Sequence, residues 1–476
     1  MKWSIIFLFV MILSGCSFAP KYERPPMNVP TSYKESGKWL RAQPSSATLD
    51  RGPWWSMYGD PVLNELEAKV VCANQNIKAA LARYDQARAV LAEQSAAYYP
   101  SLIGVFNASR QEASKNVANP LPVSLFNDKL LAVNLTYEVD LWGRVRNSVA
   151  VARSLTQASA ADLAAIDLSL HAELASDYFA LRGDDIAQHI LDQSVVMYRK
   201  ALYLTRKRYE GGAAPIADVD QAQTQYNAAK TQAADMRLNR AKLEHAIAVL
   251  IGQPPAAFSL APSLSKAKCV AVVPQLPSTL LERRPDIAEA ELKVQAANFD
   301  IGVARAAFFP ALNLSAAIGY ESTLFSNLLK RPSLAWSLGP TTASALLNDG
   351  SMPLLTQTIF DGGKLIALSQ QASARYFETV ANYRQTVLTA YQEVEDSLVA
   401  LRRLDQENKT QTAATLAAKR AMSQAMYRYK GGLTTYLDVV VIQNIALQTE
   451  LTSTDIRTRR QLASIQLIKA LGGGYA

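Results

Sequence analysis

The chain has 476 residues, of which 49% are hydrophobic and 19% are charged, and its formal net charge is +8. This length is enough for two or three ordinary domains. The basic residues are scattered singly among acidic and amide side chains, and no basic stripe is interleaved with aromatic residues. This pattern excludes nucleic acid as an expected partner and predicts a solvated basic surface.

The N-terminus has the features of an export signal. Met1-Lys2 supplies a charged start, and an apolar run from Ile5 to Leu13 leads to Leu13-Ser14-Gly15-Cys16. Such a run is too short to span a bilayer of ~30 Å, so residues 1–15 are predicted to be a cleaved signal peptide. The cleavage region resembles the bacterial lipobox, which makes Cys16 the expected lipid attachment site. In such lipoproteins an Asp directly after the Cys retains the protein in the inner membrane. Because Ser17 follows Cys16 here, the lipobox resemblance implies that the protein goes to the outer membrane.

Two halves of the chain resemble each other at a constant spacing. Arg208-Tyr209-Glu210-Gly211-Gly212 returns 220 positions later as Arg428-Tyr429-Lys430-Gly431-Gly432. Further upstream, Tyr98-Tyr99-Pro100 returns as Phe308-Phe309-Pro310. A repeat of this size is too long for a solenoid unit and indicates a duplicated half-molecule. We therefore expect a lipidated N-terminal segment at 16–59, a first repeat at 60–252, a linker at 253–276 and a second repeat at 277–476.

Short segments of period two lie between the helical parts. Apolar Leu131, Val133, Leu135, Tyr137 and Val139 alternate with polar or small residues, as in a strand with lipid on one face and water on the other. Ser101 to Arg110 is the expected partner strand, and Ala311 to Ser322 and Met352 to Phe360 are their counterparts in the second repeat. The segments at about 111–130 and 324–351 are expected to be exposed loops. No apolar window long enough for a transmembrane helix follows the signal.

Four strands of this length cannot close a barrel, and lipid does not tolerate an open sheet edge. Several chains must therefore share one barrel. Two copies would give eight strands and a filled interior, whereas three would give twelve strands and a lumen.

Long segments without Gly or Pro predict very long helices. Lys364 to Lys430 has neither residue, and Arg144 to Glu210 is interrupted only by Gly183. Each ends at a Gly-Gly pair, where left-handed backbone lets the chain turn back. The return helices are expected at Ile216 to Ile251 and Leu433 to Leu471. Coiled-coil pairing and a soluble four-helix bundle both explain these helices.

The cysteines other than Cys16 are Cys72, in a predicted helix, and Cys269, in the linker. An oxidising periplasm permits a disulfide between them. Cysteine is also a common small buried residue, so the sequence leaves both alternatives open.

These features together resemble the TolC-like outer-membrane efflux factors, in particular their lipoprotein branch. The resemblance covers nearly the whole mature chain, and four segments carry most of it: Cys16 to Pro25, Leu281-Glu-Arg-Arg-Pro-Asp-Ile287, Ile301 to Pro310 and Lys469-Ala-Leu-Gly-Gly-Gly474. It implies an α+β fold in a homotrimer, with four strands per chain in a shared twelve-stranded barrel above a periplasmic α-helical coiled-coil barrel. At 1.5 Å per residue such helices extend ~100 Å. The implied partners are a periplasmic adaptor (membrane fusion) protein and an inner-membrane pump of RND type.

The residues themselves indicate a passive protein. His171, His189 and His245 lie far apart on predicted helices, without a Cys or carboxylate cluster at metal spacing. No phosphate loop or Ser-His-Asp grouping is present, so we expect no enzyme activity, no cofactor and no metal. In Leu281-Glu-Arg-Arg-Pro-Asp, Pro285 is expected to start a helix whose N-terminus Asp286 favours.

A channel that crosses the outer membrane must be closed at its periplasmic end, and the resemblance places that gate at the two hairpin tips. Tyr436, Leu437 and Asp438 fall at the second tip with Val441 one turn along, and Asp218 is the counterpart in the first. Relatives often carry Asp where Val441 stands, so the gate is either an Asp438 ring or an apolar plug of Leu437 and Val441. Alternatively, both Asp residues only stabilise the first turn of a helix.

The tips are also the expected contact with the adaptor. Gly432-Leu433-Thr434 resembles the tip motif of the family, whereas the first tip keeps only the Gly of that motif. The expected contact residues are Gly211, Gly212, Gly431, Gly432, Leu433 and Thr434. The alternative function is a periplasmic structural lipoprotein or adaptor with coiled-coil arms, which would not need the four alternating strands.

Overall fold

The computed structural model describes residues 17–28, 30, 33–35, 52–114, 116–118, 125–265, 283–339, 355–356 and 358–473. The expected signal peptide with Cys16, and Cys269, lie outside the described residues. The chain divides into two compact units, and the division falls within helices α3, α4, α7 and α8. The first unit contains 1–26, 84–159 and 290–383, and the second contains 27–83, 160–289 and 384–476.

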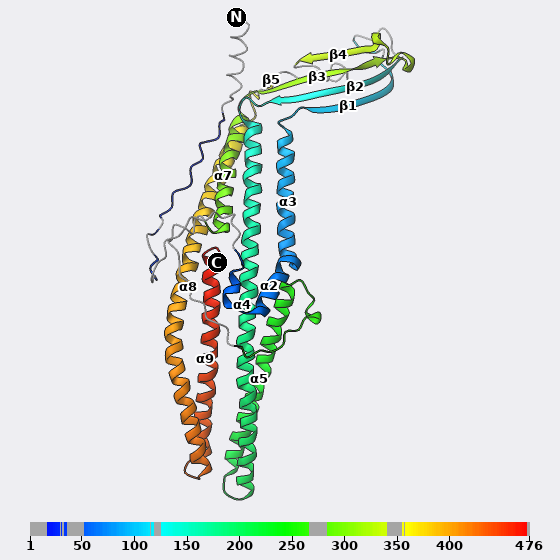
Figure 1. The fold of residues 1–476 in the computed structure, drawn as a ribbon. Helices are drawn as coiled ribbons and strands as arrows, with labels where there is room; N and C mark the ends of the chain where they lie inside the picture. Colours follow the sequence, from blue (N-terminus) through cyan, green and yellow to red (C-terminus); the bar gives the residue numbers. More distant parts are fainter. Residues whose placement is uncertain are drawn as a thin grey trace. The chain divides into compact units, whose positions relative to one another are not determined.

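Helices dominate, and their order along the chain is repeated (Figure 1). The first series is α2 (Pro61–Ala73), α3 (Gln75–Ala96), β1 (Ser101–Glu112), β2 (Leu125–Val139), α4 (Arg144–Glu210) and α5 (Ile216–Leu250). The second is α7 (Pro285–Ala306), β3 (Ala311–Ser322), β4 (Leu334–Gly339), β5 (Leu355–Thr356), α8 (Lys364–Lys430) and α9 (Tyr436–Ala470). Short 3-10 turns include η1 (Trp54–Tyr58), η2 (Pro255–Ala257), η3 (Phe325–Asn327) and η4 (Arg331–Ser333).

The two longest helices confirm the prediction from the missing Gly and Pro. α4 and α8 each contain 67 residues, and α5 and α9 each contain 35. The second return helix begins at Tyr436 and not at Leu433, because residues 431–435 are needed to reverse the chain. Among the described residues no helix is both long enough and apolar enough to cross a membrane.

The first unit contains an antiparallel sheet in the order β1-β2-β3-β4, with β5 also paired to β3. Apolar side chains lie on its exposed face: Leu131 and Val133 of β2 are 42% and 45% exposed, whereas the intervening Ala132 is buried. The predicted alternation of β2 is therefore confirmed for residues 131–134, whereas further along the strand Thr136 is more exposed than Leu135.

Two details of the predicted sheet were wrong. The loop expected at about 111–130 is shorter, because β1 continues to Glu112 and β2 begins at Leu125. The loop expected at 324–351 contains a strand, because β4 pairs with β3 there. The fourth strand expected at 352–360 is represented by β5, which lies within that range and pairs with the same edge of β3 over two described residues. The side chains of β4 alternate in exposure, which lets one face of this short strand remain apolar.

The second unit has its largest core where α2, α4, α5 and α9 meet. Tyr178, Phe179 and Leu174 of α4 are buried there with Leu63 of α2, Ile247 of α5 and Ile465 of α9. A second cluster lies at the helical hairpin tips and a third joins α8 to the end of α9.

Candidate functional site: the hairpin tips

Both helical hairpins reverse through the same hydrogen-bonded turn. Ala213 N donates to Arg208 O at 2.7 Å and Gly212 N to Tyr209 O at 2.9 Å, which defines a Schellman motif. In the second hairpin Leu433 N donates to Arg428 O and Gly432 N to Tyr429 O, at 2.9 and 3.0 Å. The repeated sequence thus encodes one turn twice.

Only the second glycine of each pair has the left-handed backbone expected from the sequence. Gly212 has φ +69° and Gly432 has φ +75°, whereas Gly211 and Gly431 do not lie in the positive region. A Cβ placed on Gly431 would come no closer than 3.6 Å to another atom. The conformational requirement for glycine therefore falls on Gly212 and Gly432.

The two tips pack against each other through a small apolar cluster. Leu202 and Val219 of the first hairpin meet Tyr429, Tyr436 and Val439 of the second. The Arg208 guanidinium lies 4.7 Å from the centroid of the Tyr429 ring, and its Nη1 donates to the Tyr429 carbonyl at 3.2 Å. One cation therefore fastens the first tip to the second.

The predicted gate residues occupy different environments. Tyr436 is only 1% exposed and packs inside the cluster between the hairpins, and Asp218 is partly buried in the first turn of α5. Leu437 and Val441 are 52% and 49% exposed. Within one chain, Tyr436 thus supports the tip from inside, while Leu437 and Val441 present apolar surface to the outside.

Asp438 is exposed and belongs to the first turn of α9. Its carboxylate accepts hydrogen bonds from the Thr434 hydroxyl and, at 3.1 Å, from the Thr435 hydroxyl. These bonds, the Thr435 backbone amide and the nearby Arg428 charge lower the pKa of Asp438 below its usual range. The carboxylate is therefore kept ionised at the start of the helix, where the helix dipole also favours it.

The apolar surface of α9 is longer than the sequence reasoning recognised. Leu433 before the helix is 74% exposed, and Ile445, one turn beyond Val441, is 51% exposed. With Leu437 and Val441 they form a series at intervals of four, which places successive members on neighbouring turns. Ile445 lies four positions after Val441, and this spacing in the sequence could have identified it as a member of the apolar series.

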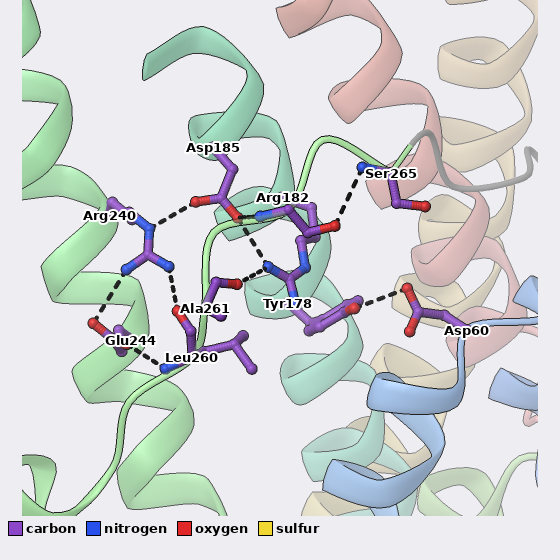
Figure 2. A network of polar contacts seen from close by, with 10 residues as sticks. Asp60, Tyr178, Arg182, Asp185, Arg240, Glu244, Leu260, Ala261 and Ser265 are labelled. Carbon is purple, nitrogen blue, oxygen red and sulfur yellow. Dashed lines mark hydrogen bonds and ion pairs between the residues drawn. The ribbon is translucent and has the colours of Figure 1, made fainter. Parts of the chain in front are cut away.

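A buried polar network holds the connection after α5 in place, and sequence reasoning did not find it (Figure 2). Asp185 of α4 accepts from Arg182 Nη1 at 2.9 Å, from Arg240 Nε at 2.7 Å and from Ser263 N at 3.0 Å. Arg182 also donates to the Ala261 carbonyl at 2.8 Å and Arg240 to the Leu260 carbonyl at 2.5 Å. Arg240 also pairs with Glu244 at 3.2 Å, so two arginines face two carboxylates, and the network fixes the segment after α5 to both α4 and α5.

A second buried group joins α2 to α4. His171 Nδ1 lies 2.5 Å from Glu67 Oε2, and its ring stacks on Trp55 with centroids 4.3 Å apart. Burial lowers the pKa of His171, but bonds and charges of Asp167 and Glu67 outweigh it and raise that pKa to about 9. Burial raises the pKa of Glu67 to about 7 although His171 opposes the shift. Within the described residues no group of three His, Cys, Asp or Glu is placed to hold a metal ion.

In the Leu281-Glu-Arg-Arg-Pro-Asp motif, the described residues Arg283 and Arg284 bind the C-terminal end of α9. Pro285 begins α7 with Asp286 in its first turn, as predicted. Arg284 pairs with Asp286 and with Glu393 at 2.6 Å and donates to the Ala470 carbonyl at 3.1 Å, and Arg283 donates to the Gly473 carbonyl at 2.9 Å. Cations thus satisfy carbonyls at the C-terminus of α9. Cys72 is exposed as a free thiol, and its possible partner Cys269 lies outside the described residues.

Comparisons with known proteins agree with this architecture. The family model described as outer membrane efflux protein matches residues 68–253 and 276–473. Outer membrane protein OprJ of Pseudomonas aeruginosa is 32% identical, with 98% of this chain and 95% of OprJ covered. Cation efflux system protein CusC of Escherichia coli is 27% identical, with 98% of each covered.

Solved structures give the same result for the fold. The CmeC outer membrane channel of Campylobacter jejuni superimposes with a TM-score of 0.88 at 25% identity, covering 97% of this chain and 95% of that one. The outer-membrane channel OprN superimposes with a TM-score of 0.85 at 26% identity, covering 96% and 99%. The match of the family model over most of the sequence, together with these relatives, shows that the chain belongs to the outer membrane efflux protein family.

Proposed function

We propose that three copies of this chain form a passive exit duct in the outer membrane, through which small toxic compounds such as drugs leave the cell. The observation that carries the proposal is the sheet of the first unit. Among the described residues, the outer strand β1 pairs only with β2, so the other edge of β1 has no strand partner there. Its exposed face is apolar, and an open edge in lipid is not tolerated.

Three chains with four strand positions each would close a barrel of twelve strands. The fourth position is supplied by β4 and β5 together, since both pair with the same edge of β3. A twelve-stranded barrel is wider than an eight-stranded one, whose own side chains fill the interior. The trimer is thus favoured by the need for a lumen.

The duct would work with two partners: a periplasmic adaptor and an inner-membrane pump of RND type that supplies the energy. Relatives bear names such as antibiotic efflux pump outer membrane protein and cation efflux system protein. Cargo choice would therefore belong to the pump, and the duct would supply a path. The second tip, with Gly432, exposed Leu433 and Thr434, is the proposed adaptor contact, together with Gly211, Gly212 and Gly431.

For the gate we propose a hydrophobic constriction formed by Leu437 and Val441, which we call the dry plug. Three copies of exposed Leu437 and Val441 around a threefold axis would close the path by excluding water. Asp438 would form a vestibule that attracts cations, while Tyr436 and Asp218 would support the tips from within and from the opposite helix start.

Processing of the N-terminus completes the proposal. Residues 1–15 would be removed, Cys16 would carry the lipid, 16–59 would be the lipidated segment, and repeats at 60–252 and 277–476 would flank the linker 253–276. A Cys16→Ala variant should lack labelled lipid but still form trimers, because the barrel itself holds the protein in the membrane.

The decisive test is assembly and conductance of the purified mature protein. A duct should migrate as a heat-modifiable oligomer on gels, give the spectroscopic signal of β-structure expected from a barrel, and conduct ions in planar bilayers. The alternative function, a periplasmic structural lipoprotein or adaptor with coiled-coil arms, predicts a water-soluble protein without conductance once Cys16 is removed. That result would overturn the duct.

A further inference from the structure

The first described segment of the chain is bound along α7. Arg24 pairs with Glu291 through two hydrogen bonds, one of them 2.8 Å from Nε to Oε1. Asn298 Nδ2 donates to the Pro20 carbonyl at 2.7 Å, and Arg305 Nη1 donates to the Phe18 carbonyl at 3.5 Å. Residues 17–24, which we call the strap, therefore run antiparallel to α7 and contact one of its faces at intervals of seven residues, which is about two turns.

The extended length of the strap is similar to the length of α7 that it covers. From Glu291 to Arg305 the helix rises about 21 Å at 1.5 Å per residue. The six residue-to-residue steps from Phe18 to Arg24 reach about 20 Å when fully extended. The strap therefore covers most of α7, from Glu291 to the end that leads into β3, where Phe18 lies.

An aromatic stack holds that end of the strap. The Phe18 ring lies 4.4 Å from the Phe309 ring, nearly parallel to it, and Phe309 stacks on Trp142 at 5.0 Å. Trp142 Nε1 donates to the Pro310 carbonyl at 2.8 Å. Trp142 follows β2, and Phe309 precedes β3, so Phe18 is fastened at the bases of both strands.

The backbone of the strap lies against α7 at Gly302. A Cβ placed there would lie 2.7 Å from Ala19 Cβ and 2.8 Å from Ala19 N, and 2.5 Å from Asn147 Nδ2. The Ser17 hydroxyl donates to Asn147 Oδ1 at 3.1 Å on α4. A glycine at 302 is therefore required for the strap to lie against both helices.

We propose that the strap is a positioning device for the lipid anchor, with Phe18 and Gly302 as its positioning residues. The inference rests on the proposed lipid attachment at Cys16, which one peptide bond joins to Ser17. Because Phe18 is held at the bases of β2 and β3, the acyl chains enter the bilayer beside the strands of their own chain. The position of the anchor thereby helps to set the depth of the barrel in the membrane.

The test uses a palmitic acid analogue that carries a photoreactive diazirine and an alkyne, supplied to cells that make the full-length protein. After irradiation, the acylated N-terminal peptide is recovered and its crosslinked peptides are identified by mass spectrometry. Wild type should crosslink to peptides of β2 and β3 in its own chain. The Phe18→Ala and Gly302→Ala variants should carry as much analogue as wild type but lose most of these crosslinks. In the folded variants, trypsin should also cleave after Lys21 faster than it does in folded wild type.

Phe377→Ala is the control, because Phe377 is 69% exposed on α8 and forms an aromatic pair only with Tyr376 among the described residues. It should behave as wild type. Equal crosslinking and equal trypsin cleavage in all variants would overturn the positioning role while leaving the lipid attachment intact. A wild-type protein without analogue on Cys16 would overturn both. Conductance of the same preparations tests the duct separately, since barrel closure does not require the lipid.

Discussion

Arg208 of the first hairpin covers the ring of Tyr429 in the second and donates to its carbonyl oxygen. The two hairpins come from different repeats, so this contact couples the two halves of the chain at their tips. The surrounding cluster is small, which makes a single cation a substantial part of the contact.

Replacing Arg208 by Ala should loosen the two tips. A cation–π contact contributes about 0.5–1 kcal/mol and a hydrogen bond from a charged donor about 1.5–3 kcal/mol. We expect a several-fold rise in basal conductance in planar bilayers. Lys207→Ala is the matched control, because Lys207 is exposed and pairs only with Glu210 of its own helix in the described chain. Equal conductance of the two variants would show that Arg208 does not hold the tips together.

The turn at the second tip gives a pair of variants that differ by one position. Gly432→Val places a β-branched residue at positive φ, which costs on the order of 1–2 kcal/mol, whereas Gly431→Ala fits without strain. Efflux of a dye should fall in Gly432→Val and stay unchanged in Gly431→Ala, while heat-modifiable oligomers form in both. If Gly432→Val exports as well as wild type, this turn is not needed for adaptor contact.

How far the sequence predicts the molecule depends on how local each signal is. The ends of α4 and α8 follow from Gly-Gly pairs and from the absence of Pro, which act on the backbone at their own positions. The alternation of Leu334, Trp336 and Leu338 was present too, but the Asn, Ser, Pro and Gly residues of the segment 324–351 favoured a loop. In that case pairing with β3 outweighed local propensity.

The interior of the candidate site was less accessible to sequence reasoning. Tyr436 is adjacent to exposed Leu437, and only the packing of the opposite hairpin decides which of the two is buried. Likewise, Asp185 and Arg240 are 55 residues apart in sequence, so their ion pair depends on the return path of α5. Contacts of this kind arise from tertiary structure and leave no periodic signal.

The buried His171–Glu67 contact predicts a dependence of stability on pH. The folded pKa of His171, about 9, is above its ordinary value of 6.5. Its stabilisation is therefore complete below pH 6.5 and is lost as pH rises through 9, by on the order of 3 kcal/mol. The raised pKa of Glu67, about 7, acts in the same direction between its ordinary value of 4.5 and 7. Thermal unfolding midpoints should fall between pH 6.5 and 9.

In the His171→Gln variant the thermal unfolding midpoint should change less between pH 6.5 and 9 than in wild type, because the substitution removes the titrating ring but keeps a polar side chain. His189→Gln is the control, since His189 is in contact with Gln193 on the exposed side of α4 and not with a buried carboxylate. A wild-type midpoint that is constant over this pH range would show that His171 is not charged in the folded protein.

The last prediction separates an apolar gate from an electrostatic one. Leu437 and Val441 are about half exposed in a single chain, so closing them against copies around an axis would remove apolar surface from water. Asp438 is already satisfied by Thr434 and Thr435 and stays ionised, and three such carboxylates near one axis would repel each other. Leu437→Ser combined with Val441→Ser should therefore raise single-channel conductance and sensitise cells to bulky antibiotics, whereas Asp438→Asn should mainly weaken cation preference. If Asp438→Asn opens the channel and the double Ser variant conducts like wild type, the carboxylates hold the gate and the dry plug is wrong.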